Sequence, residues 1–101
     1  MTETQVSPCS SVRTLFPLGE VTATANILWD IPRADLFAAL ECHTSGSWGD
    51  VDPLQRQKNE NAIRHGGIIR SIHHSRIGQR FYIETSTKSL ETRVSTDKDL
   101  S

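Results

Sequence analysis

The chain has 101 residues, of which 36% are hydrophobic and 6% aromatic, and its formal net charge is −1 at pH 7. A chain of this length forms one domain with a modest core and leaves no room for a deep substrate cavity. No apolar run is long enough to cross a membrane, and the sequence does not begin with the basic and then apolar pattern that is typical of a signal peptide. We therefore expect a soluble, cytoplasmic protein without a membrane partner. The two cysteines, Cys9 and Cys42, are widely spaced, which favours a reduced pair over a disulfide or a metal site.

The charge is distributed unevenly along the chain. Residues 1–50 hold two basic and six acidic side chains, whereas residues 51–101 hold nine basic and six acidic ones. Most of the positive excess lies in segment 56–80, where Glu60 is the only acidic residue. Such a segment forms either an ordinary solvated face or a contact for an anionic partner. The candidate partner-binding residues are Arg56, Lys58, Arg64, Arg70, Arg76 and Arg80.

The first quarter of the chain predicts little regular structure. Residues 1–14 are polar and without periodicity, which is typical of a flexible arm. Residues 15–24 predict an extended lead-in that packs on the core, with a pairing at a sheet edge left open. Thr24 is placed to cap a short helix over residues 25–30, and Pro32 must end or restart that helix because proline lacks the backbone N–H.

Two longer helices follow. The first is expected over residues 32–43, with Gly46 at its exit, and its buried stripe would consist of Leu36, Phe37 and Leu40. The second begins at Asp52, the predicted N-cap, with Pro53 in the first turn and Gln55 reaching back to the cap. It runs to about residue 65, where Gly66 provides the stop, and its thin apolar content places it on the surface.

The hydrophobic pattern then changes to an alternation typical of strands. Three segments alternate, at residues 68–75, 80–86 and 90–95, and Gly78 marks a hairpin between the first two. The sequence therefore predicts an α+β fold of two layers, with two or three N-terminal helices packed on a three-stranded antiparallel β-meander. The domain would span residues 15–95, followed by a flexible tail at 96–101. The face beneath the helices would carry Phe81, Ile83, Leu90 and Val94.

The stretch HTSGSWGDV, at residues 43–51, is the most distinctive part of the sequence. Its glycines permit backbone angles that other residues resist, and its tryptophan is large enough to fill the seam between helices and sheet. Its aspartates can accept hydrogen bonds from local backbone amides and cap the next helix. The loop then offers too few oxygen ligands for a hard metal ion. We therefore expect no metal and no cofactor here. The residues with a structural role would be Trp48, Gly46, Gly49, Asp50 and Asp52.

The four histidines do not form a recognisable catalytic pattern. His73 and His74 fall on opposite faces of a strand and cannot chelate one ion. Acid–base chemistry would require His43, His65 or one of that pair to converge with a lysine or arginine, and nothing in the spacing imposes this. No nucleophile elbow, phosphate loop or HExxH motif occurs. We expect a protein without catalytic residues, and a small histidine-dependent nuclease stays as an alternative.

The order of LFPLGEVTAT, HTSGSWGDVD, NENAIRHGG, IIRSI and GQRFYIETS resembles a group of short bacterial proteins carried on plasmids and other mobile elements. These proteins have SGDWGD-type loops and a strand of the form IWIITEAD. The resemblance spans about residues 15–95, and its most specific part is SGSWGD at 45–50, where Ser47 replaces the usual acidic residue. The last strand, LETRVS, is more polar than in that group. The resemblance implies a mobile-element setting with no established activity.

Small proteins of such elements often inhibit host defences by binding their complexes, which is an analogy of setting and not of chemistry. The first expectation is therefore a non-catalytic binding protein that inhibits a host nucleic-acid-targeting defence complex, of anti-CRISPR or antirestriction type, by protein–protein contact. The alternative is a nucleic-acid-binding accessory protein that uses the basic segment 56–80. The chain is expected to be a monomer or a homodimer joined at a sheet edge.

Overall fold

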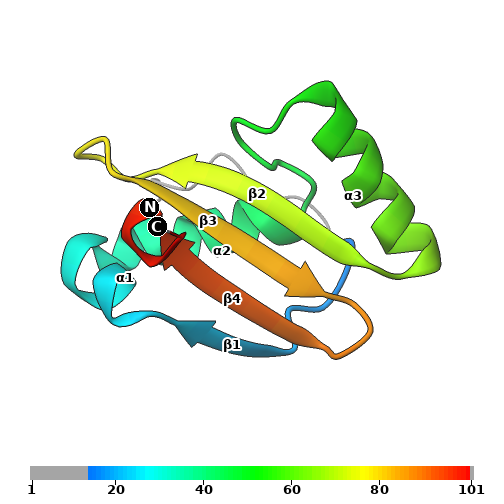
Figure 1. Cartoon of the computed structure of the whole chain (residues 1–101), viewed down its shortest axis with the longest axis horizontal. Coiled ribbons are helices and arrows are strands. Elements are labelled where there is room, and N and C mark those ends of the chain that lie inside the picture. The colour runs from blue at the N-terminus through cyan, green and yellow to red at the C-terminus, as the bar shows by residue number, and fades with distance from the viewer. Residues whose placement is uncertain (1–13, 101) are drawn as a thin grey trace, which may run out of the picture.

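The computed structural model describes residues 14–100, and its centre is a mixed four-stranded sheet. The strands pair in the spatial order β1-β4-β3-β2 (Figure 1). β2 is antiparallel to β3 and β3 to β4, whereas β1 runs parallel to β4. The strand bounds are β1 Glu20–Ala23, β2 Ile68–His74, β3 Arg80–Ser86 and β4 Glu91–Thr96.

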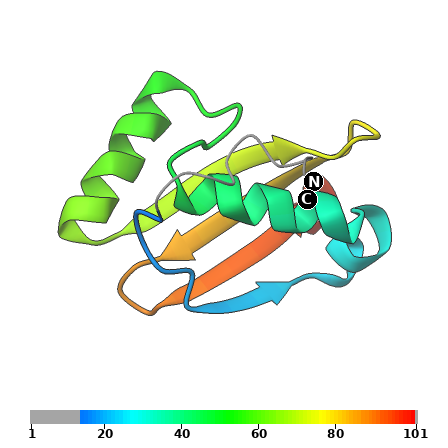
Figure 2. The ribbon, with the colours of Figure 1, turned by 180° about the vertical axis from the view of Figure 1, so that it is seen from behind.

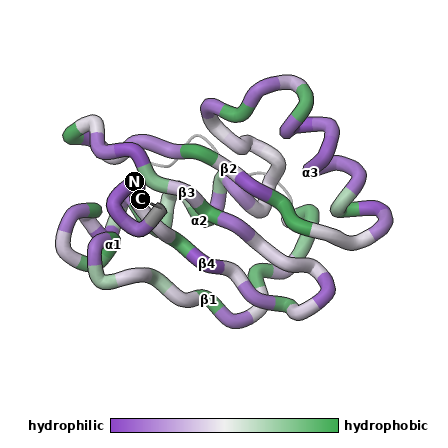
Figure 3. Tube along the Cα trace, in the orientation of Figure 1, coloured by the Kyte–Doolittle hydropathy of each residue, from purple (hydrophilic) through white to green (hydrophobic). Residues whose placement is uncertain are grey.

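α2 lies across one face of this sheet and α3 along its β2 edge, whereas α1 and α4 lie together at the end where β4 finishes. Figure 2, which is the view from behind, shows α2 in front of the sheet and α3 beside β2. Figure 3 shows α3 as a mostly hydrophilic helix, as its composition predicts. The helix bounds are α1 Ala25–Asp30, α2 Arg33–Thr44, α3 Pro53–His65 and α4 Asp97–Leu100. The last of these occupies a segment that the sequence assigns to a flexible tail.

The predicted three-stranded antiparallel meander is wrong, because β1 adds a fourth strand in parallel orientation. The Glu20 amide donates to the Leu90 carbonyl at 2.9 Å, and the Thr24 amide donates to the Val94 carbonyl at 3.1 Å. Gly19 makes this approach feasible: it has a φ of 67°, and a Cβ there would lie 1.9 Å from the Leu90 oxygen. A four-residue strand paired with a segment about 70 residues later leaves no local pattern that predicts it.

The apolar core consists of two clusters. One lies beneath α1 and α2 and consists of Ile27, Ile31, Leu36, Ala39, Phe81, Ile83 and Val94. The other lies between α3 and β2 and consists of Phe16, Trp48, Ala62 and Ile69. Burial of these side chains is the main favourable contribution to folding in a domain of this size.

The helix ends largely follow the predicted signals. The Thr24 hydroxyl accepts from the Ile27 amide, and the Asp52 carboxylate accepts from the Gln55 amide at 2.7 Å. Gly66 ends α3 with a φ of 91°. One prediction is wrong, because Gln55 does not reach back to the cap: its side-chain amide donates instead to Asn59 Oδ1 at 2.9 Å.

Two residues expected in the core are exposed. Phe37 is 58% exposed, because the buried side of α2 is formed by Leu36, Ala39 and His43. Leu90 is 53% exposed, because it belongs to the turn between β3 and β4 and adopts a φ of 57°. The polar His43 therefore occupies a core position of α2, where the sequence pattern predicts only apolar residues.

Candidate functional site

The tryptophan loop, which we define as residues 45–52, fills the seam between α2, α3 and β2. Trp48 is 2% exposed and packs against the cluster that contains Phe16 and Ile69. Its indole Nε1 donates to the His43 carbonyl at 3.0 Å, which satisfies the polar atom of the ring. The Arg56 guanidinium lies 5.7 Å from the ring centroid on the outer side. The indole is therefore buried in this seam.

The same loop covers the outer edge of β2. The Ile72 amide donates to the Trp48 carbonyl, and the Asp50 amide donates to the Ile72 carbonyl, each at 3.0 Å. Gly49 stands between them with a φ of 71°, and a Cβ there would lie 1.9 Å from the Ile72 oxygen. Only glycine fits this close approach of two backbones.

Asp50 differs from its predicted role. Its side chain was expected to bond local amides, but one carboxylate oxygen lies 3.3 Å from His74 Nδ1, and the side chain is 70% exposed. Asp50 and Asp52 line a hollow of about 350 Å³ together with Arg70 and Tyr82. Within residues 14–100, no three acidic, histidine or cysteine side chains gather in a way that could hold a metal ion.

A row of hydrogen-bonded side chains crosses the inner face of the sheet beneath α2. His73 Nε2 lies 2.9 Å from Ser71 Oγ, and Ser71 Oγ lies 2.6 Å from His43 Nδ1. His43 Nε2 then lies 2.8 Å from Thr85 Oγ1. The row continues through Thr92 and ends at the backbone carbonyl of Leu18. We call these side chains the histidine chain.

The donor and acceptor of each hydrogen bond in the histidine chain follow from the end of the chain at Leu18. The Leu18 carbonyl can only accept, so the Thr92 hydroxyl donates to it at 2.6 Å. Thr92 must then accept from Thr85, at 2.7 Å, and Thr85 must accept from His43 Nε2–H. A neutral His43 therefore carries its proton on Nε2 and accepts at Nδ1 from Ser71. Because Ser71 donates its one hydroxyl proton to His43, it accepts from His73 Nε2–H.

Burial keeps both histidines of this chain neutral. Desolvation, and secondarily the nearby His73, lowers the pKa of His43 to about 3. Desolvation also lowers the pKa of His73 to about 4, with His74 lowering it further and Asp50 opposing the shift. Ser71 and His43 form a hydroxyl–imidazole pair of the kind that activates a nucleophile, but both are fully buried. The pair can hold the fold together but cannot reach a substrate.

The four histidines do not converge on one open site. His43 and His73 belong to the buried chain, whereas His74 lies on the opposite face of the sheet beside Asp50. His65 is exposed near the far end of α3. His73 and His74 do line one open hollow of about 310 Å³, together with Arg76 and Asp35. The histidine-dependent nuclease therefore stays an alternative prediction.

Three of the six predicted basic contact residues are engaged by acidic groups of the chain itself. Arg76 binds the Asp35 carboxylate, with a shortest distance of 2.8 Å, and its guanidinium and backbone amide hold the pKa of Asp35 below its ordinary value. Arg80 lies 3.5 Å from Asp97. The third is Arg70, which pairs with Glu84.

Arg70 is held on the outer face of the sheet. Its Nε lies 3.4 Å from Glu84, an ion pair without hydrogen-bond geometry. Its guanidinium lies 5.3 Å from the centroid of the Tyr82 ring. The Tyr82 hydroxyl in turn donates to Asp97, which lowers the pKa of that carboxyl and raises that of the tyrosine.

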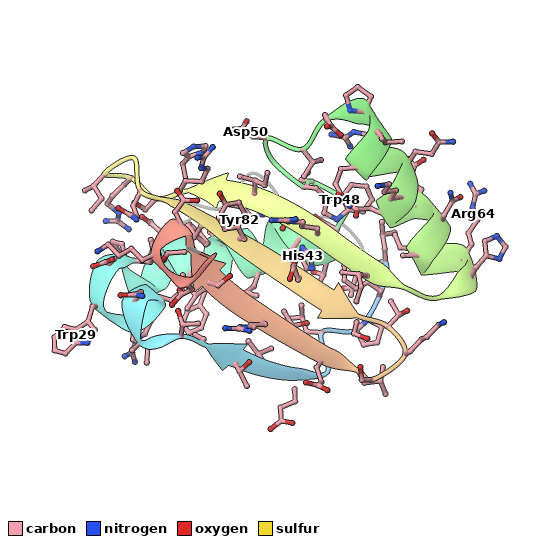
Figure 4. The ribbon with its side chains drawn as sticks, in the orientation of Figure 1. Trp29, His43, Trp48, Asp50, Arg64 and Tyr82 are labelled. Atoms are coloured by element: carbon pink, nitrogen blue, oxygen red, sulfur yellow. The ribbon has the colours of Figure 1, made fainter. Side chains whose placement is uncertain are left out.

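The other three basic residues remain at the surface of α3. Arg56, Lys58 and Arg64 are exposed there, and Figure 4 shows Arg64 projecting from the helix. No salt bridge joins any of them to a described acidic residue. The structure therefore divides the predicted basic set into a tied group on the sheet side and an available group on α3.

Sequence reasoning missed the most exposed apolar residues. Trp29 is 85% exposed and the adjacent Leu28 is 64% exposed, both on α1. Figure 4 shows Trp29 pointing away from the ribbon beyond α1. The signal was available, because successive residues of a helix point about 100° apart and Ile27, Leu28 and Trp29 cannot share one buried side. Ile27 takes the core position and leaves its two neighbours in solvent.

Cys42 on α2 is disulfide-bonded, so the prediction of a reduced pair is wrong. Sequence spacing does not report the distance between two sulfur atoms in the fold, which is what decides whether they can be bridged. Cys9 lies outside the described residues.

Comparison with protein-family models, with curated proteins and with solved structures finds no match for the chain. The expected relationship to mobile-element proteins therefore stays a prediction. Among residues 14–100, none of the helices is both long enough and apolar enough to cross a membrane.

Proposed function

We propose that the protein is a small non-catalytic binding module that contacts a partner protein through Leu28 and Trp29 of α1. The observation that carries this proposal is the 85% exposure of Trp29. Tryptophan is on average a highly buried residue, and it is enriched among the side chains that dominate binding energy at protein interfaces. A neighbouring exposed leucine enlarges the apolar contact.

The helix that presents these two residues is firmly anchored. The Asp99 carboxylate accepts from the Thr24 hydroxyl at 2.7 Å and from the Asn26 amide at 2.9 Å. Lys98 donates to Asp30 at 3.0 Å, which ties α4 to the end of α1. Because α1 is fixed before binding, a partner does not have to order it, and that preorganisation favours affinity.

The target class rests on the resemblance of residues 15–95 to mobile-element proteins. We propose that the partner is a host nucleic-acid-targeting defence complex, inhibited in the anti-CRISPR or antirestriction manner. The exposed basic residues of α3 support this target, because a complex that handles nucleic acid also carries bound phosphates near its protein surfaces. No step of this proposal requires catalysis by the chain.

The test is a pull-down from bacterial lysate, treated with nuclease, followed by mass spectrometry. The wild-type protein should capture subunits of a defence complex, and Trp29→Ala should lose them. Ile77→Ala is the matched control, because Ile77 is also 72% exposed but lies in the turn between β2 and β3. Equal capture by all three proteins would refute the contact through α1, and capture of unrelated proteins would refute the target class.

We place the protein in the cytoplasm, where such complexes act. Fractionation of cells followed by immunoblotting tests this placement. The chain should be recovered in the cytoplasmic fraction, and its recovery from another compartment would contradict the placement.

A second candidate function is nucleic-acid binding through α3. It is favoured by the three exposed basic residues on that helix, although the tied residues of segment 56–80 reduce the set that the sequence suggests. Fluorescence anisotropy at low salt tests it: binding through three phosphates would give a slope of about −2.7 in log affinity against log salt on duplex DNA. Absence of binding would exclude this function.

A further inference from the structure

The two edges of the sheet are protected to different degrees. At β2, the tryptophan loop binds both main-chain groups of Ile72, and the buried Asn59 side chain binds both main-chain groups of Arg70. At β1, no described residue covers the outer edge, which lies opposite to β4 in the sheet order. Uncovered edges invite pairing with another strand.

The backbone direction of β1 identifies the groups available for such pairing. The amides of Glu20 and Thr24 donate to carbonyls in and beside β4, so the main-chain groups of these residues point into the sheet. Main-chain groups alternate in direction along a strand. The N–H and C=O groups of Val21 and Ala23 therefore point outward, away from β4.

We propose that two copies of this chain join through their β1 edges to form one continuous sheet. In an antiparallel pairing about a two-fold axis at Thr22, Val21 lies opposite Ala23 of the second copy. The outward groups of both residues then form a self-complementary set of four hydrogen bonds. Glu20 lies opposite Thr24 of the second copy, so no like charges meet across the axis.

Apolar side chains support the same arrangement on the helix side of the sheet. On α2, Asp35 binds Arg76 in the turn between β2 and β3. Phe37, two residues later, lies about 200° around the helix and so faces the side of β1. Figure 2 shows α2 passing between that turn and β1. Val21 is 42% exposed and Phe37 58% exposed.

A two-fold axis perpendicular to the sheet keeps the helices of both copies on the same side. Val21 of each copy then lies beside the axis, so the pairing buries its exposed apolar side chain as well as backbone groups. This self-complementarity is the reason for proposing a second copy and not an extended segment of another protein, which would use the same backbone groups without the two-fold match. The pairing is independent of the contact through Trp29.

The experiment is sedimentation velocity of the full-length protein over a concentration series. The wild-type protein should sediment with twice the chain mass of 11.3 kDa. Val21→Pro removes an outward N–H without removing a hydrogen bond of the monomer, and it should raise the dimer dissociation constant about tenfold or more. Val21→Lys places a charge beside the axis and should have the same effect.

Ile77→Lys is the matched control, because it introduces the same charge at an exposed apolar position far from β1, and it should leave the dimer unchanged. Circular dichroism of each variant should match that of the wild type, which excludes loss of folding as the cause. A wild-type protein that is monomeric up to about 1 mM would overturn the proposal. So would a dimer that both Val21 variants leave as tight as before.

Discussion

Asn59 binds both main-chain groups of Arg70: its Oδ1 accepts from the Arg70 amide at 2.9 Å, and its Nδ2 donates to the Arg70 carbonyl at 2.7 Å. A side-chain amide thus takes the place of a neighbouring strand at the edge of β2. The position is fully buried, so the two backbone groups have no water to replace these bonds. This contact explains how a hydrophilic helix is fixed to the sheet.

Replacing Asn59 by leucine should therefore destabilise the fold. The variant has a similar volume but leaves the Arg70 amide and carbonyl unpaired, which costs about 1–3 kcal/mol for each buried group. Urea unfolding measures the change in the free energy of unfolding. Asn61→Leu, on the exposed side of the same helix, should change it by less than about 0.5 kcal/mol. Equal effects of the two variants would contradict the role of the contact.

The histidine chain predicts that stability falls below pH 6.5. The folded pKa values of about 3 for His43 and about 4 for His73 lie below the ordinary 6.5, so the unfolded chain binds more protons in between. The contribution of the two histidines to the free energy of unfolding is therefore fully present above pH 6.5. It decreases as the pH falls, by up to about 1.4 kcal/mol per pH unit for each histidine. The carboxylates with lowered pKa values act in the same direction only below about pH 4.

Urea titrations at pH 7.5 and pH 5 test this window. His43→Gln should lower stability at both values and reduce the difference between them, because one of the two titrating groups is gone. His65→Gln, at an exposed position on α3, should leave the difference unchanged. A wild-type protein that is equally stable at both pH values would show that the histidine chain is not neutral and buried as described.

Trp48 should be far more important for stability than Trp29. Trp48→Ala removes a buried indole and should cost about 3–5 kcal/mol, which is a large part of the stability of a small domain. Trp29→Ala removes an exposed side chain and should change stability by less than about 0.5 kcal/mol. Thermal unfolding by circular dichroism compares the two. A loss of stability in Trp29→Ala as large as that in Trp48→Ala would be inconsistent with the packing.

Leu90 is a position where glycine should stabilise the protein. Its φ of 57° costs a residue with a Cβ about 1–2 kcal/mol, part of which the greater freedom of glycine in the unfolded chain offsets. Leu90→Gly should gain about 1 kcal/mol in the free energy of unfolding. Leu90→Val, whose branched side chain tolerates positive φ poorly, should lose stability. In urea unfolding, the free energy of unfolding should therefore be higher than that of the wild type for Leu90→Gly and lower for Leu90→Val.

The features that were predictable from the sequence are those specified by nearby residues. Thr24, Asp52 and Gly66 mark helix ends through hydrogen bonds or backbone angles that involve residues within four positions. The alternation of residues 68–86 likewise predicts the antiparallel pair β2–β3, whose turn is short. Local signals of this kind act before tertiary contacts form and are therefore visible in one sequence.

The features that escaped prediction depend on distant contacts. β1 has only four residues, and its partner lies near the other end of the chain. His43 contacts Thr85 across 42 positions, and no local pattern shows that a histidine replaces an apolar core residue. The apolar residues of α2 would allow the helix to face the sheet with Phe37 either buried or exposed. The contact between Asp35 and Arg76 favours the rotation of the helix that exposes Phe37.

The affinity of Trp29→Ala for the protein that the wild type captures is the most direct test of contact through α1. A central tryptophan of an interface contributes about 2 kcal/mol or more, so the dissociation constant measured by calorimetry should rise about 30-fold or more. Ile77→Ala should bind like the wild type. A dissociation constant unchanged by the loss of Trp29 would contradict the proposal that this exposed indole is the contact.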